Sequence, residues 1–233
     1  MHRFFCDNKQ NNSFLLDKDL LHHIKVARLE NDDFLINYQN QFYKCKLNKA
    51  TLCADIIEKV NIDNEYKKDL VLAAPIIKPE RFEWMIEKAT ELGVKKIIPM
   101  LSQFCNHKYA QNNFSDKKMQ RYKAKILSAA EQSFRNVIPE ITSVQKFTNI
   151  IDFYIEKGYK LYIAHELVST DNTLDNIETN SVVLIGPEGG FSQSEIDYVA
   201  NKNYDQIKII SLGKTILRAE TAAIKMLSKI KEK

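Results

Sequence analysis

The spacing of hydrophobic residues changes near residue 69. Before that point, apolar runs are short and are separated by clusters rich in Asn, Asp and Gln. Residues 34–38 and 42–47 predict two strands around a turn at 39–41, and residues 52–60 predict another strand. One short helix is predicted at 17–26, with Asp17 as its N-cap. Residues 1–68 therefore predict a small β-rich domain, and the polar stretch that ends at residue 69 is its predicted boundary.

Strands and helices alternate from residue 69 onward. Near-continuous Leu, Val, Ile and Ala predict a buried strand at 69–77, and helical spacing predicts a helix at 81–92 that stops at Gly93. Ser192 and Glu195 have the spacing of a capping box that opens a later helix. Further strands are predicted at 96–101, 139–144, 159–164, 182–185 and 206–212, and further helices at 117–135, 148–157 and 219–230. This alternation indicates an α/β domain with a mainly parallel sheet over residues 69–233.

Glycine is scarce and concentrated. Of the six glycines in the chain, Gly186, Gly189, Gly190 and Gly213 lie in the segments 185–192 and 212–221. Each segment follows a predicted strand and leads into a predicted helix, so tight turns or a close backbone approach are expected there. A single loop of this kind is equally consistent with a simple tight turn. Two of them, with charged residues beside the second, favour a pocket for a flat, polar ligand.

Two common nucleotide-binding motifs do not fit the chain. Gly213-Lys214-Thr215 ends like a Walker A loop, but Lys208, within a predicted strand, stands where that loop needs its first glycine. The first strand–helix turn, at 76–80, contains no glycine, which disfavours a Rossmann-type cofactor site. A ligand site is therefore expected only at the two late loops.

Composition and charge add little that is specific. The chain has 233 residues, of which 44% are hydrophobic and 27% are charged, as in ordinary soluble proteins. No apolar run is long enough to span a bilayer and the first residues do not suit a secretory signal, so a cytoplasmic protein without a membrane partner is predicted. The four cysteines lack the spacing of zinc ligands, and no metal is expected. The net charge of +4 and the basic run at 106–125 are weak indications of a polyanionic partner.

The two glycine-bearing segments, IGPEGGFS at 185–192 and LGKTILRAETA at 212–222, resemble the signature of the RsmE family. Members of this family are SPOUT-class enzymes that use S-adenosylmethionine to methylate N3 of a uridine in 16S ribosomal RNA. Other segments similar to the family are MHRFF at 1–5, HHIKVAR at 22–28, KATELGV at 88–94 and AAEQSFR at 129–135. The chain departs from the family at Gln103-Phe104, where Glu-Arg is usual, and at Phe134, where glycine is frequent.

The resemblance implies a fold and a set of partners. It implies a C-terminal SPOUT-type α/β domain with a trefoil knot and a small N-terminal PUA-like β-barrel that binds RNA. It also implies a homodimer with its site at the subunit interface, and the small (30S) ribosomal subunit as partner. The cofactor, S-adenosyl-L-methionine, is then expected to contact Leu184, Ile185, Gly186, Pro187, Glu188, Gly189, Gly190, Ser211, Leu212, Gly213, Ile216, Leu217 and Arg218.

The same resemblance suggests roles in chemistry and RNA binding. Arg218 is expected to stabilise negative charge on a uracil carbonyl as N3 loses its proton, and Glu188 is a candidate base or cofactor ligand. In the simpler interpretation, Arg218 pairs with Glu220 and Glu188 only caps the next helix. RNA phosphates are expected at Arg3, Arg28, Lys108, Lys117, Lys118, Arg121 and Arg135.

Two alternatives remain open from the sequence. One is a SPOUT enzyme that methylates a ribose 2′-OH or transfer RNA. The other is a non-catalytic RNA-binding protein that keeps the fold without a cofactor.

Overall fold

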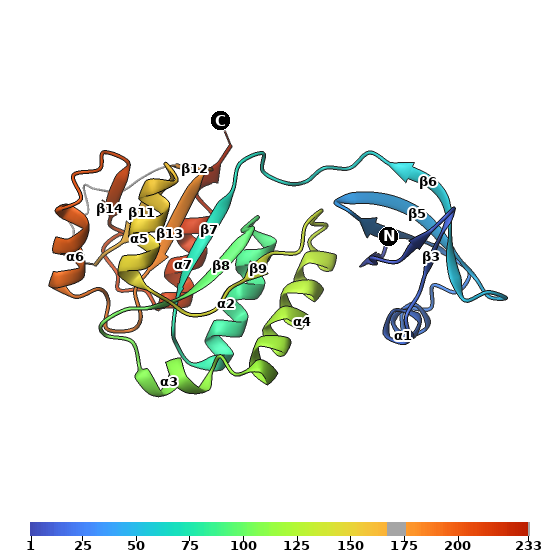
Figure 1. Ribbon diagram of the computed structural model, residues 1–233, viewed down its shortest axis with the longest axis horizontal. Coiled ribbons are helices and arrows are strands. Elements are labelled where there is room, and N and C mark those ends of the chain that lie inside the picture. The colour runs from blue at the N-terminus through green and yellow to red at the C-terminus, as the bar shows by residue number, and fades with distance from the viewer. Residues whose placement is uncertain (167–175, 233) are drawn as a thin grey trace. The chain divides into compact units, whose positions relative to one another are not determined.

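The computed structural model describes residues 1–166 and 176–232, and it separates the chain into two compact units (Figure 1). The first unit comprises Met1–Glu65 together with Ala130–Val137, and the second comprises Tyr66–Ala129 together with Ile138–Lys233. The break near residue 66 lies close to the predicted boundary at 68. The segment Ala130–Val137 was expected in the second domain, and long-range contacts place it in the first.

The first unit contains a six-stranded sheet with the order β1-β4-β5-β6-β3-β2. The two predicted strands around the turn are present as β4 and β5, and the predicted strand at 52–60 is present as β6. Helix α1 begins where predicted, because the Asp17 side chain accepts a hydrogen bond of 2.7 Å from the Leu20 amide. The strands β1 to β3 were not predicted, because two or three residues are too few to show alternation. The elements are β1 Arg3–Phe5, β2 Lys9–Gln10, β3 Ser13–Leu15, α1 Lys18–Val26, β4 Asp33–Tyr38, β5 Gln41–Asn48 and β6 Cys53–Val60.

A buried ion pair joins Ala130–Val137 to the rest of this unit. The Arg135 side chain is 3% exposed, and its Nε and Nη2 each donate to one carboxylate oxygen of Glu65 at 2.7 Å. Asn136 adds hydrogen bonds from its amide to Glu65 (2.8 Å) and from Nδ2 to the Ile62 carbonyl (2.7 Å). A bidentate pair of this kind is costly to break when buried, because either partner alone would be an uncompensated charge. Arg135 is therefore engaged in the core of this unit, and an RNA phosphate would have to displace Glu65 to reach it.

Glu131, in the same segment, is a largely buried carboxyl group. Burial raises its pKa to about 7, and a hydrogen bond of 3.4 Å from the Phe5 amide acts in the opposite direction. Because the folded-state pKa lies above the unfolded value of about 4.5, ionisation of Glu131 opposes folding. Its contribution to stability is fully present below pH 4.5 and is lost as the pH rises through 7.

We therefore expect Glu131→Gln to raise the melting temperature at about pH 8 and to leave it nearly unchanged at about pH 4.5, since glutamine keeps the acceptor but cannot ionise. Thermal unfolding of both proteins at the two pH values measures this. Glu156→Gln, the same change at an exposed position of helix α5 (Phe147–Glu156), is the control. An equal shift at both pH values would contradict the assignment.

The second unit is a parallel α/β sheet with helices on both faces. Its seven-stranded sheet has the order β10-β8-β7-β13-β11-β14, with β9 paired to β8, and its pairings in the described residues are parallel. The elements are β7 Leu70–Pro75, α2 Pro79–Glu91, β8 Lys96–Leu101, α3 His107–Asn112, α4 Asp116–Gln132, β9 Glu140–Ile141, β10 Gln145–Lys146, α5, β11 Lys160–Ala164, β12 Ile177–Glu178, β13 Ser181–Ile185, α6 Gln193–Ala200, β14 Ile207–Ile210, α7 Ala219–Leu227 and β15 Ile230–Lys231.

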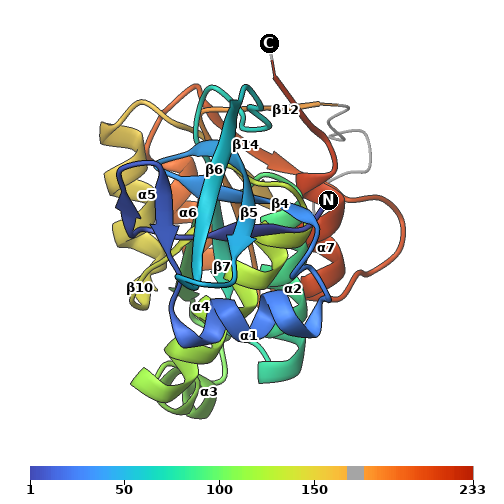
Figure 2. The ribbon, with the colours of Figure 1, turned by 90° about the vertical axis from the view of Figure 1, so that its right-hand side faces the viewer.

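Two hydrophobic cores cover the two faces of this sheet. Side chains of α2, α4 and α7 pack in one core, and side chains of α5 and α6 pack in the other; Figure 2 shows α2 and α7 on the opposite side of the sheet from α5 and α6. Successive residues of β7 enter alternate cores, Leu72 the first and Ala73 the second. This double burial explains the continuous apolar run that predicted the strand.

Most predicted elements of the second unit are present within a few residues of their expected ends. The strand predicted at 139–144 is instead two short strands, β9 and β10, which both pair with β8. The short elements α3, β12 and β15 were not predicted. None of the helices in the described ranges has the length and hydropathy needed to cross a bilayer.

Candidate functional site

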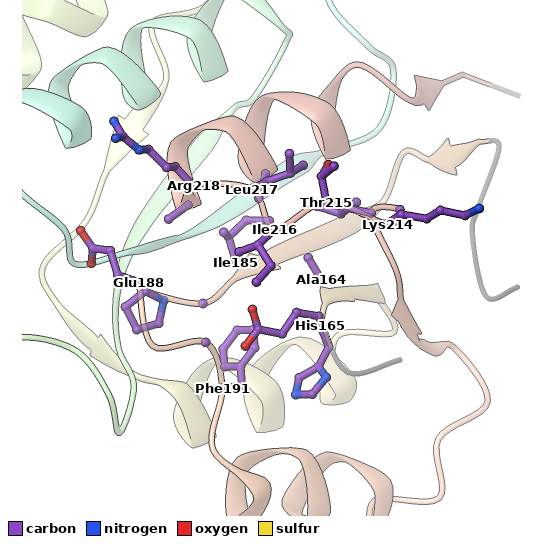
Figure 3. A pocket seen from close by; sticks show the side chains of 18 of the residues that line it. Ala164, His165, Ile185, Glu188, Phe191, Lys214, Thr215, Ile216, Leu217 and Arg218 are labelled. Carbon is purple, nitrogen blue, oxygen red and sulfur yellow. The ribbon is translucent and has the colours of Figure 1, made fainter. Parts of the chain in front are cut away.

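The two glycine-bearing loops come together at one edge of the parallel sheet. Strand β11 pairs with both β13 and β14, so the loops that follow these two outer strands flank the end of β11. They enclose a cavity of about 360 Å³, drawn in Figure 3. Its walls are Arg81, Ala164, His165, Glu166, Ile185, Gly186, Pro187, Glu188, Gly190, Phe191, Leu212, Gly213, Lys214, Thr215, Ile216, Leu217, Arg218, Ala219 and Ala222.

The first loop is a tight turn that needs its glycines. The Gly190 amide donates to the Pro187 carbonyl at 2.8 Å, and Gly190 has a φ of +70°. A Cβ added to Gly186 would lie 2.9 Å from the Gly190 carbonyl carbon, so the two ends of the turn touch backbone to backbone. The predicted capping box follows, with Ser192 and Glu195 bonded to each other's backbone amides.

The second loop is held by its own helix. Gly213 has a φ of +108°, and its amide donates to Ser211 Oγ at 3.3 Å. Lys225 of α7 reaches back and donates from Nζ to the Leu212 carbonyl at 2.6 Å. Arg218 ends the loop as the N-cap residue of α7. The close-up shows Ile216 and Leu217 beside Ile185 in the pocket (Figure 3).

Most residues expected to contact a cofactor line this cavity, but three do not. Leu184 is fully buried in the core under α5 and α6, because alternate strand residues face opposite sides of the sheet and its neighbour Ile185 faces the cavity side. Gly189 packs against Phe104, where an added Cβ would lie 2.9 Å from the Phe104 Cβ. Ser211 is 2% exposed and bonds within its own loop.

Arg81 is a cavity residue that sequence reasoning missed. It lies in the first turn of α2, directly after β7, and β7 is the sheet neighbour of β13. Its guanidinium lies between two carboxylates, with Nη1 3.6 Å from Glu188 Oε1 and Nε 3.6 Å from Glu220 Oε1. The turn at 76–80 was set aside because it lacks glycine. Arg81 could have been found from the sequence as a cation that follows the strand next to β13 in the sheet.

The simpler interpretation of the two charged candidates does not hold. Glu188 does not cap α6, since Ser192 and Glu195 form that cap. Glu220 pairs with Arg81, and Arg218 is exposed with no ion pair within the described ranges. Arg218 and Glu188 appear toward the same end of the pocket, while Lys214 points away on the other side (Figure 3). The site thus combines Glu188, a carboxylate that pairs with Arg81, and Arg218, a guanidinium at the same end of the pocket that makes no ion pair in the described residues.

The loop after β8 carries the departure at residues 103 and 104. Glu195 Oε1 accepts a hydrogen bond of 2.9 Å from the Gln103 amide, and Ser194 Oγ donates to Gln103 Oε1 at 2.9 Å. Phe104 packs its Cβ on Gly189 and leaves half of its side chain exposed. Gln103 thus holds this loop to helix α6, and Phe104 contacts the first glycine loop at Gly189.

Comparison with known proteins identifies the family. A family model described as an RNA methyltransferase domain matches residues 64–231. The ribosomal RNA small subunit methyltransferase E of Mesomycoplasma hyopneumoniae is 39% identical over 229 residues, which cover 98% of each chain. The chain belongs to the methyltransferase E family. The resemblance to the RsmE family, first seen in the two loops, is thereby confirmed, and the similarity extends over 98% of the chain.

Other methyltransferase E relatives and solved structures agree. The relative from Bacillus subtilis is 27% identical and covers 94% of this chain and 89% of its own. A solved structure of a protein from Legionella pneumophila, in complex with the bound cofactor SAM, is 27% identical, with a TM-score of 0.77 and coverage of 97% of this chain and 95% of that one. The methyltransferase E of Neisseria gonorrhoeae shares the fold, with a TM-score of 0.83 over 98% and 95% of the chains at 23% identity.

The basic residues expected at RNA differ in their availability. Arg28, Lys108 and Lys117 are exposed. Lys118 donates to Asn113 Oδ1 at 2.9 Å, and Arg121 lies 2.7 Å from Glu83 with a side chain that is 67% exposed. A phosphate would have to compete with these partners, so Arg28, Lys108 and Lys117 are the stronger members of the set.

Arg3 is partly committed to the first unit. Its guanidinium donates to the Gln132 carbonyl at 2.8 Å and lies 4.4 Å from the centre of the Phe134 ring. Phe134 has a left-handed φ of +64°, the conformation that the glycine frequent at this position adopts without strain. The ring contacts with Arg3 and with Phe42, at 5.1 Å between centroids, hold the strained backbone in place.

In the parts of the chain that are described, no group of three or more His, Cys, Asp or Glu side chains is arranged to hold a metal ion. The four cysteines are free thiols, and burial raises the pKa of Cys45 to about 12.

Proposed function

We propose that this protein transfers a methyl group from S-adenosyl-L-methionine to N3 of a uridine in the 16S ribosomal RNA of the small subunit. The observation that carries the proposal is the 39% identity, over nearly the whole of both chains, to a protein named ribosomal RNA small subunit methyltransferase E. The cavity that is lined by both glycine loops supports this proposal as the binding place for the cofactor. The choice of N3 rests on the RsmE resemblance.

The residues of the cavity fit this cofactor. Gly186 lets the backbone close into a thin wall, because a Cβ there would lie 2.9 Å from the Gly190 carbonyl carbon, and Gly190 supplies the left-handed φ of +70° that the turn needs. Ile185, Leu212 and Leu217 present an apolar surface for the adenine ring, and backbone groups of both loops would contact the ring edge and the ribose. Glu188 and Glu166 place negative charge on a cavity that would hold a sulfonium cation. Bound S-adenosylmethionine supplies a methyl group that is already activated for transfer.

The chain then has to position the uridine and help N3 to lose its proton. Arg218, exposed and without an ion-pair partner in the described residues, is placed to stabilise the negative charge that develops on a uracil carbonyl. Glu188 is the candidate proton acceptor. Arg81 holds the Glu188 carboxylate at the cavity wall through its 3.6 Å contact, and Glu220 shares that guanidinium from the first turn of α7.

Several features implied by the family belong to the same proposal. We propose that the second unit contains the SPOUT trefoil knot and that the first unit is a PUA-like barrel that binds RNA. We also propose a homodimer whose site lies at the subunit interface, acting in the cytoplasm where ribosomes are assembled. The six strands of the first unit and the exposed Arg28 in that unit support an RNA-binding role for it.

Methyl transfer to separated RNA substrates tests this function. Purified protein and S-adenosylmethionine labelled in its methyl group are incubated with one unmethylated substrate at a time. The three substrates are 16S RNA, 30S subunits and transfer RNA. We expect label in 16S RNA or 30S subunits only. Label in transfer RNA alone would favour the alternative SPOUT activity. Absence of both transfer and cofactor binding by calorimetry would favour the non-catalytic RNA-binding protein.

A further inference from the structure

A second cavity, of about 340 Å³, lies at the opposite edge of the parallel sheet from the glycine loops. Its lining includes residues that precede or begin β7, β8 and β11, whereas the glycine loops follow the ends of their strands. The lining residues are Asp69, Val71, Lys95, Lys96, Phe153, Tyr154, Lys157 and Tyr159. Neither the methyl-transfer site nor the predicted basic run includes any of them.

Three aromatic rings form a connected series in this cavity. Phe153 and Tyr154 of α5 meet edge to face at 5.1 Å, and Tyr154 meets Tyr159 edge to face at 4.9 Å. Tyr154 is buried and supports the other two rings, and Tyr159 donates its hydroxyl to Asp69 at 3.1 Å. Phe153 is 50% exposed, so half of this supported residue is accessible to solvent.

The cavity is also basic. Three lysines line it against one carboxylate, Asp69. Lys95 lies 3.5 Å from Asp69, and Lys96 lies 2.9 Å from Glu140 outside the cavity. Lys157 lies 5.8 Å from the centre of the Phe153 ring and makes no ion pair in the described part of the chain. The Lys157 ammonium group therefore lies over the half-exposed Phe153 ring and has no carboxylate partner in the described residues.

We propose that this cavity binds an unpaired nucleotide of a single-stranded RNA segment, with its base stacked on Phe153 and its phosphate at Lys157. Aromatic faces beside cationic side chains are the means by which proteins hold unstacked RNA bases, and they act without base-specific hydrogen bonds. Because the cavity and the glycine loops lie at opposite edges of the sheet, this contact is separate from the target uridine. The proposed contact extends the RNA-binding surface of the protein beyond the methyl-transfer site.

Binding of a fluorescein-labelled oligouridine to the full chain tests the proposal. We expect Phe153→Ala and Lys157→Glu each to weaken binding by about tenfold, in the range of a lost stacking contact. For Lys157→Glu, the slope of log K against log salt should also fall by at least about 0.7, the value for one phosphate contact to a single strand. Lys208→Glu, the same charge change at an exposed position of β14, is the control and should have little effect.

A second variant reports directly on stacking. Trp84 is the only tryptophan in the sequence, so Phe153→Trp in a Trp84→Phe background places the single indole at the cavity. We expect the oligouridine to quench its fluorescence while affinity is retained, and uridine monophosphate to bind far more weakly. The proposal would be overturned if both Phe153→Ala and Lys157→Glu kept the parent affinity, or if only Lys157→Glu lost affinity. Equally tight binding of uridine monophosphate would also overturn it. Calorimetry with S-adenosylmethionine distinguishes a failure of this proposal from a failure of the proposed cofactor site. Cofactor affinity should be the same in the parent protein and in the Phe153 and Lys157 variants.

Discussion

Replacement of Arg218 by alanine should reduce kcat for methyl transfer by about 10²–10³-fold, the loss seen when one preorganised donor to a developing oxyanion is removed. Arg218 is exposed, makes no ion pair in the described residues and gives no side-chain hydrogen bond to the start of α7, so the substitution removes neither kind of contact. The melting temperature should therefore stay within about 2 °C of the parent protein. Single-turnover methylation of 16S RNA measures the rate, and calorimetry measures cofactor affinity.

Arg218→Lys is the informative companion. Lysine keeps the charge but loses the planar fork of donors, so we expect partial recovery of kcat. Arg28→Ala, at an exposed arginine of the first unit, tests whether the loss of any surface arginine has the same effect. If Arg218→Ala retains a rate within threefold of the parent, about 0.6 kcal/mol, Arg218 has no part in the chemistry.

Replacement of Gly186 by alanine should weaken binding of S-adenosylmethionine by about 10–100-fold. The added Cβ would lie 2.9 Å from the carbonyl carbon and 3.1 Å from the Cα of Gly190, and backbone atoms cannot rotate away as a side chain can. Forcing a methyl group into such a contact costs about 1–3 kcal/mol. The loop has to open, which displaces the wall of the cavity at Pro187 and Glu188.

Gly158→Ala is the matched control for this prediction. Gly158 also lies in the second unit and has a φ of +73°, but an added Cβ would meet nothing within 4 Å. Alanine there should lower stability because of the left-handed backbone and should leave cofactor affinity unchanged. Cofactor affinity in Gly186→Ala equal to that in Gly158→Ala would show that the closed glycine loop is not the cofactor wall.

The sequence predicted the elements whose pattern is local. Continuous apolar residues in β7, helical spacing in α2 and the Ser192–Glu195 cap are each decided by neighbours in the chain, and each is present in the structure. The glycine loops belong to the same class, because a turn with a close backbone approach needs glycine wherever it occurs. Their placement at strand ends was enough to predict a pocket, and both loops line a cavity in the structure.

Contacts between distant segments were not predictable in this way. Arg135 and Glu65 are 70 residues apart, and nothing near either one indicates a buried bidentate pair. Arg81 reaches the cavity only because β7 lies next to β13, a neighbour relation that follows from strand order in the sheet. Leu184 was expected to contact the cofactor as the first residue of the stretch 184–190, but alternation along β13 turns its side chain to the core under α5 and α6. Which residues line the cavity therefore depends on the order of the strands in the sheet and on the alternation of side chains along each strand.

Position-resolved mass mapping of 16S RNA tests the central claim most directly. The RNA is methylated by the purified protein with labelled cofactor, digested to nucleosides and fragments, and compared with RNA treated with Arg218→Ala. We predict label on N3 of the base at a single uridine, and almost none with the variant. Label on a ribose 2′-oxygen, on another base atom or at many scattered uridines would contradict the proposed activity.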